Sequence, residues 1–122
     1  MAAKKIYIAG HRGMVGSAIE RCLRACGYND LITRTHEELD LLDQRAVLDF
    51  LQRVKPDYVF LAAAKVGGIQ ANNVFRADFI YENLQIQNNV IYGALKAGIR
   101  DLCFLGSSCI YPRNCPQPIK ES

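Results

Sequence analysis

Residues 5–19, KIYIAGHRGMVGSAI, decide the fold of this chain. A short apolar run ends at Gly10, and Gly13 and Gly16 follow at three-residue spacing where a helical pattern begins. In such a turn the first glycine permits the tight passage from strand to helix. The second lets the backbone approach a pyrophosphate, and the third allows close packing of helix on sheet. Since helix amides attract the anion, the stretch predicts a dinucleotide-binding turn, with a plain tight turn as the alternative.

The rest of the chain alternates short β-branched or aromatic runs with amphipathic stretches, as in right-handed β-α-β units. Helices are expected to end at Gly27, to begin after Asp43, and to extend from about residue 75 to 97. Residues 65–73 are expected to form a loop, and strands are expected at residues 5–10, 30–34, 57–64 and 101–108. The pattern predicts an α/β fold with a doubly wound, Rossmann-like parallel sheet that is truncated after about its fourth strand.

Composition excludes several classes of protein. The chain has 122 residues, half of them hydrophobic, which suits one modest core. Its 15 basic residues are scattered among 12 acidic ones, so no nucleic-acid partner is expected. The apolar run near the N-terminus is too short for a signal or a membrane span. We therefore expect a cytoplasmic protein with no membrane partner.

The five cysteines are expected to be reduced, because their number is odd and no signal segment precedes them. Cys22 and Cys26 fall on the same predicted helix as Val15, Ile19 and Leu23. Their spacing favours small buried hydrophobic residues over metal ligands. No metal site is predicted.

The choice of cofactor depends on the charge at the end of the second strand. Folds that select NAD usually place a carboxylate there, which binds the ribose 2′-hydroxyl. Here the segment ITRTHEE, residues 32–38, carries Arg34 and His36, and Arg12 lies inside the glycine turn. Cations favour a 2′-phosphate, so the sequence predicts NADP(H). Arg34 and His36 could equally be solvated loop residues.

Five segments carry a resemblance to a known family: IAGHRGMVGSAI (8–19), LDLLDQRAV (39–47), LAAAKVGGIQANN (61–73), ADFIYENL (77–84) and FLGSSCIYP (104–112). With these segments the chain resembles the extended short-chain dehydrogenase/reductases. Within that family it is similar to the NADPH-dependent epimerase/reductases that convert GDP-4-keto-6-deoxy-D-mannose to GDP-L-fucose. The resemblance implies an enzyme of nucleotide-sugar biosynthesis whose substrate is a GDP-sugar.

The resemblance also implies cofactor-binding residues. Asp40 and Leu41 would lie against the adenine, and the alanine run 62–64 would pass beneath the cofactor, although such a run is equally a close-packed strand. Asn83 and Asn89 match two asparagines of the family's fourth helix, where an asparagine can organise the site or simply be solvated. The full cofactor set is Gly10, His11, Arg12, Gly13, Met14, Val15, Gly16, Arg34, His36, Asp40, Leu41, Ala62, Ala63, Ala64, Leu105, Gly106 and Ser108.

Two residues are predicted to be catalytic by the same resemblance. Ser107 would hydrogen-bond the C4 oxygen of the substrate during hydride transfer, and Cys109 would exchange protons during epimerisation. Without the family, Ser107 reads as a turn residue and Cys109 as a buried hydrophobic residue. The family's YxxxK pair and the histidine partner of the cysteine are expected beyond Ser122. Tyr92 and Lys96 have the YxxxK spacing but precede Ser107, so they are not that pair.

We therefore expect residues 1–122 to form the N-terminal part of an NADP-binding domain that is inactive alone. The runner-up is a catalytically inactive dinucleotide-binding or interaction module. A homodimer through the helix 75–97 is also expected, since this helix carries two apolar rows and one would suffice to cover a sheet. The rows are Ile80, Leu84, Ile91 and Leu95, and Phe79, Ile86, Val90 and Ala97.

Overall fold

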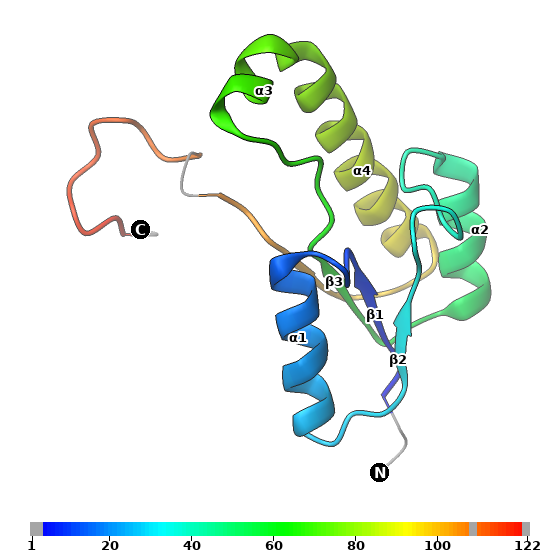
Figure 1. Cartoon of the computed structure of the whole chain (residues 1–122). Coiled ribbons are helices and arrows are strands. Elements are labelled where there is room, and N and C mark those ends of the chain that lie inside the picture. The colour runs from blue at the N-terminus through cyan, green and yellow to red at the C-terminus, as the bar shows by residue number, and fades with distance from the viewer. Residues whose placement is uncertain (1–3, 108–109, 121–122) are drawn as a thin grey trace.

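The computed structural model describes residues 4–107 and 110–120 (Figure 1). Strands and helices alternate as the sequence predicts, although the strands are shorter. Residues 65–73 were expected to be a loop, which is wrong in part, because a short helix begins at Ile69. The elements are β1 (Ile6–Ala9), α1 (Met14–Ala25), β2 (Leu31–Thr33), α2 (Gln44–Val54), β3 (Tyr58–Leu61), α3 (Ile69–Val74), α4 (Arg76–Lys96) and β4 (Asp101–Phe104).

The four strands form one parallel sheet in the order β2-β1-β3-β4. After β2 the chain crosses back over β1 to reach β3, so the direction of winding reverses between β1 and β3. Since crossovers between parallel strands are right-handed, this reversal places α1 and α2 on opposite faces. Figure 1 shows α1 on one face and α2 with α4 on the other. The predicted doubly wound, Rossmann-like fold is confirmed.

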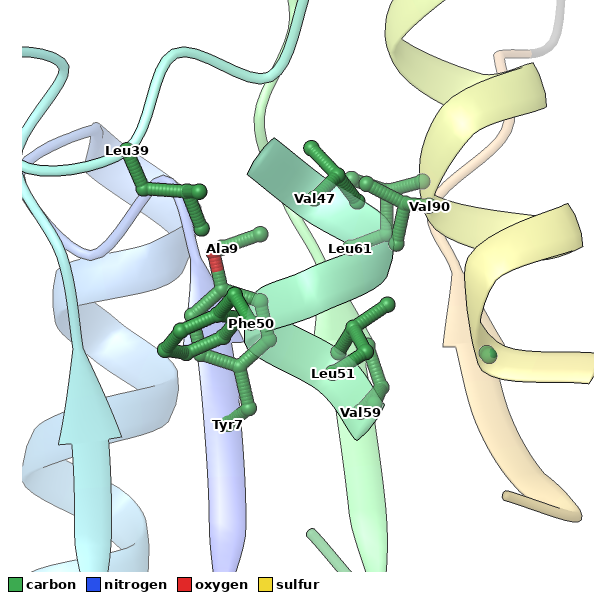
Figure 2. Close-up of a cluster of buried hydrophobic side chains, with 10 residues drawn as sticks. Tyr7, Ala9, Leu39, Val47, Phe50, Leu51, Val59, Leu61 and Val90 are labelled. Carbon is green, nitrogen blue, oxygen red and sulfur yellow. The ribbon is translucent and has the colours of Figure 1, made fainter. Parts of the chain in front are cut away.

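The main core lies between the sheet and the layer formed by α2 and α4 (Figure 2). The rings of Tyr7 and Phe50 meet edge to face, with their centroids 4.9 Å apart. Gly93 allows α4 to approach α2 closely, because a Cβ at this position would lie 3.0 Å from a methyl group of Leu51. The core residues are Tyr7, Ala9, Leu39, Val47, Phe50, Leu51, Val59, Leu61, Val90 and Ala94.

The helix ends follow the local signals. The side chain of Asp43 accepts a hydrogen bond from the backbone amide of Ala46 at 3.0 Å, which caps α2. Gly27 follows α1 with φ +86°, the left-handed conformation that glycine adopts without strain. In the described parts of the chain, no helix combines the length and the apolar character that crossing a membrane requires.

The expectation that Cys22 and Cys26 are buried is wrong, because both are exposed. The side of α1 that faces the sheet carries the buried Gly16 and the half-buried Ile19 and Leu23. At 100° per residue, Cys22 lies roughly 90° around the helix from the centre of that side. Cys26 lies nearer to it but follows the last residue of α1. The predicted stripe was therefore too wide for all its members to reach the sheet.

Candidate functional site

The glycine turn packs directly against the carboxyl end of β3. Gly10 has φ +86°, and a Cβ there would lie 2.7–2.8 Å from backbone atoms of Ala62 and Ala63. A Cβ on Gly16 would lie 2.1 Å from the carbonyl oxygen of Gly10. No side chain caps α1 at Gly13, so its first amides remain available to an anion. The turn thus sits where the winding reverses, which is where open α/β sheets bind ligands.

A cavity of about 790 Å³ opens beside this turn. Its walls are the turn itself, the segment that follows β2, the segment that follows β3, and two side chains of α4. The volume lies in the range typical of cofactor sites. The cavity brings together most of the predicted cofactor residues: Gly10, His11, Arg12, Gly13, Met14, Val15, Arg34, His36, Asp40, Leu41, Ala62, Ala63 and Ala64.

The remaining predicted residues are placed differently. Gly16 lies beneath the turn, in contact with Gly10, rather than in the cavity wall. Leu105 and Gly106 follow β4 and, like Ser107, are not among the residues that line the cavity. The amide of Leu105 donates to the carbonyl of Leu61 at 3.3 Å, which carries the β3–β4 pairing one residue beyond β4. Ser108 and Cys109 lie outside the described residues.

The end of the cavity next to β2 carries three basic side chains. The Nη1 atom of Arg34 donates a hydrogen bond to the carbonyl of Thr33 at 2.7 Å. The guanidinium of Arg34 also lies 5.3 Å from the ring centroid of Phe50. Arg12 is exposed, and within the described residues it has no recorded hydrogen bond or ion pair. The Nδ1 atom of His36 lies 3.7 Å from Oδ1 of Asp40. Arg34 is thus fixed in place, whereas Arg12 is able to turn toward a ligand.

Glu37 and Glu38 follow β2, and their surroundings differ. Glu38 closes a capping box with Thr35: its Oε2 accepts from the Thr35 amide at 2.7 Å, and its own amide donates to the Thr35 hydroxyl at 3.3 Å. The bond from the Thr35 amide is the main cause that lowers the pKa of Glu38, with Arg34 and Arg12 acting in the same direction. Glu37 lines the cavity. Glu37 belongs to the segment 32–38, but the charge pattern of that segment did not predict it as a site residue.

Lys65 and Glu82 were also missed as cavity residues. They form an ion pair across the cavity wall, from the segment after β3 to α4. Their separation in the sequence gave no signal of this contact.

Tyr7 forms part of the lining as well, and burial raises its pKa well above the usual range, with Arg34 partly opposing the shift. The phenol of Tyr7 therefore stays uncharged in the cavity wall.

The model of the NAD dependent epimerase/dehydratase family matches residues 6–122. The chain belongs to this family. GDP-L-fucose synthase 1 of Arabidopsis thaliana is 60% identical over 118 residues, and GDP-L-fucose synthase of Escherichia coli (strain K12) is 55% identical over 122. These matches confirm the resemblance seen in the sequence. They cover 97% and 100% of this chain but only 36% and 38% of the relatives, so the chain spans little more than a third of their length.

A solved structure has the same arrangement of strands and helices as this chain. MlghC, a GDP-mannoheptose C4 reductase from Campylobacter jejuni with NADP bound, is 48% identical and superposes with a TM-score of 0.92. The match covers 98% of this chain and 38% of MlghC.

Replacing Gly10 with alanine tests the contact between the turn and β3. A left-handed alanine costs about 1–2 kcal/mol, and the clash with the backbone at Ala62 adds to that cost. We expect Gly10→Ala to lower the thermal midpoint clearly in calorimetry. Gly106→Ala is the matched control, because a Cβ at Gly106 meets nothing within 4 Å. Equal midpoints for the two variants would show that the turn does not need Gly10.

Proposed function

We propose that residues 1–122 are the N-terminal part of the NADP-binding domain of an enzyme that converts GDP-4-keto-6-deoxy-D-mannose to GDP-L-fucose. The observation that carries this proposal is the glycine turn, which opens at the reversal of winding onto a cavity with basic side chains at its β2 end. The substrate rests on the relatives, two of which are named GDP-L-fucose synthases. The described cysteines are free, which suits the reducing cytoplasm as the location.

Three features of the site support NADP(H) as the cofactor. Gly10 and Gly13 line the cavity without a Cβ, and the alanines after β3 have only a methyl group, so a pyrophosphate can approach the backbone there. Arg12 and Arg34 offer charge to a 2′-phosphate. Glu38 is not among the residues that line the cavity, and its carboxylate accepts from the Thr35 amide.

The proposed chemistry has two parts. Bound NADPH would supply a hydride to C4 and become NADP⁺, and a proton from solvent would reach the C4 oxygen, so that the ketone becomes an alcohol. Ser107 would donate a hydrogen bond to the C4 oxygen as negative charge develops there. Cys109 would exchange protons at C3 and C5, the carbons next to the ketone, without any change of oxidation state. The competing proposal, an inactive dinucleotide-binding module, predicts binding without oxidation of NADPH.

Arg12→Ala tests the preference for NADPH. Because Arg12 is the exposed cation of the turn, we expect its loss to weaken NADPH binding roughly tenfold and NADH binding less than about twofold. Isothermal titration calorimetry of the 122-residue chain measures both. Arg53→Ala, on the last turn of α2, is the control. An unchanged ratio of the two affinities would remove Arg12 from the proposal.

A chimera tests the reaction. Residues 1–122 would be joined to the part of the E. coli relative that follows its matched segment. The 122-residue chain alone is expected to bind NADPH without oxidising it, and the chimera is expected to oxidise it with the keto sugar. In the chimera, Ser107→Ala should slow reduction about a hundredfold, and Cys109→Ser should slow deuterium incorporation at C3 and C5 by a similar factor. Equal losses of both activities in both variants would contradict the separate roles.

We further propose a homodimer through α4. Ile80, Leu84, Ile91 and Leu95 form one exposed row, which we call the outer row of α4. Of the second predicted row, Val90 is fully buried, and Ile86 and Ala97 pack against the core. A two-fold interface would cover the outer row of each copy with that of the other.

Charging the outer row tests the dimer. The double variant Leu84→Glu with Ile91→Glu is expected to shift the chain toward monomer in sedimentation velocity, because two carboxylates would have to be buried per copy. Gln52→Glu, on the exposed side of α2, is the control. An unchanged sedimentation coefficient in the folded double variant would argue against this interface.

A further inference from the structure

Two asparagines of α4 hold the two opposite walls of the cavity. Asn83 binds the residue that follows the alanine run: its Oδ1 accepts from the amide of Lys65 at 2.7 Å, and its Nδ2 donates to the carbonyl of Lys65 at 3.0 Å. Nδ2 also donates to the carbonyl of Phe79, one turn earlier in α4, at 2.9 Å. Both backbone groups of Lys65 are thus satisfied by one side chain, as they would be in a strand ladder.

Asn89 acts in the same way on the other wall. Its Nδ2 donates to the carbonyls of Leu41 and Leu42 at 2.8 and 3.1 Å, and its Oδ1 accepts from Gln85 at 2.9 Å. The side chain is 2% exposed, the one buried polar residue in the described part of the chain. Removing this amide would leave the carbonyls of Leu41 and Leu42 without their donor, which is costly in an apolar layer. The segment 40–42 is therefore fixed to α4.

The two walls receive different halves of a dinucleotide. In this fold the ribose of the adenosine lies at the end of β2, and the pyrophosphate lies at the glycine turn. The segment that Asn89 holds is at the β2 end of the cavity, and Lys65, which Asn83 holds, is past the turn on the β3 side. The asparagines are six residues apart, which is about 9 Å along a helix. One rigid helix thus connects both walls.

We propose that Asn83 and Asn89 are positioning residues that set the affinity for the two halves of the dinucleotide separately. Asn89 holds the wall for the adenosine half, and Asn83 holds the wall for the nicotinamide half. This inference rests on the proposed function, since it needs a dinucleotide in the cavity.

The test compares two probes in calorimetry of the 122-residue chain: NADPH, and 2′,5′-ADP, which has only the adenosine half. Asn89→Ala is expected to weaken both probes by the same factor, about tenfold. Asn83→Ala is expected to weaken NADPH by a similar factor and to leave 2′,5′-ADP within about twofold. Asn88→Ala is the matched control, because Asn88 is the exposed neighbour on the same helix. A general loss of stability in Asn83→Ala would weaken both probes, and for Asn89→Ala an unchanged thermal midpoint in calorimetry separates the loss of affinity from a loss of stability.

The outcomes distinguish the two proposals. If the unaltered chain binds neither probe, the proposed function fails, and the inference fails with it. If it binds both, and Asn83→Ala weakens 2′,5′-ADP as much as NADPH, or either variant behaves like Asn88→Ala, only the inference is overturned. Asn83→Ser and Asn89→Ser, which keep one hydroxyl donor, serve if an alanine variant does not fold. Failure of both variants of a residue to show a cooperative thermal transition would assign that residue to folding alone and overturn its proposed role.

Discussion

The close contact between the glycine turn and the end of β3 is the constraint on which the rest of the site depends. The pairing of β1 with β3, from Ile6 opposite Tyr58 to Ala9 opposite Leu61, fixes how far both strands extend. Gly10 then has to pass within van der Waals contact of the backbone at Ala62. Gly16 has to sit on the Gly10 carbonyl, which directs the N-terminus of α1 at the cavity. A side chain at either glycine would separate the helix from the strand.

The core and the basic end of the cavity are continuous. Tyr7 meets Phe50 edge to face in the core, and the Phe50 ring also lies 5.3 Å from the guanidinium of Arg34, which follows β2. A cation over an aromatic face is attracted by the ring electrons, and its side chain loses conformational freedom. The position of a charge that would face a ligand is therefore set by hydrophobic packing between α2 and the sheet. Substitutions at Phe50 would alter the site as well as the core.

Helix α4 has one side in the core and one outside it. Its inner side carries Val90, Gly93 and Ala94, which pack closely on α2, with Asn89 among them. Within the described residues, no buried polar atom of a side chain lacks a partner. An amide side chain in an apolar layer fixes the position of its helix, because only one arrangement satisfies all its hydrogen bonds. Apolar contacts alone would allow the helix to slide. This explains how loops as irregular as residues 40–42 and 62–66 can keep the cavity open.

The sequence by itself determined the features that depend on neighbouring residues. The spacing of Gly10, Gly13 and Gly16, the cap at Asp43 and the alternation of strands and helices all predicted the observed fold, because turn geometry and helix ends are local properties. The family resemblance, carried by short motifs, was confirmed by the matches to relatives. Most of the predicted cofactor residues line one cavity for the same reason, since the carboxyl ends of parallel strands meet at one edge.

Only the tertiary structure decided what depends on distant partners. Periodicity placed Cys22 and Cys26 on an apolar stripe, but the width of the contact with the sheet left them exposed. It found two rows on α4 but could not say that Val90 is buried and Leu84 exposed. Asn89 contacts carbonyls 47 and 48 positions away, and Lys65 pairs with Glu82 across the cavity wall. Such contacts follow from the order of the strands and the packing of α4, which no local pattern encodes.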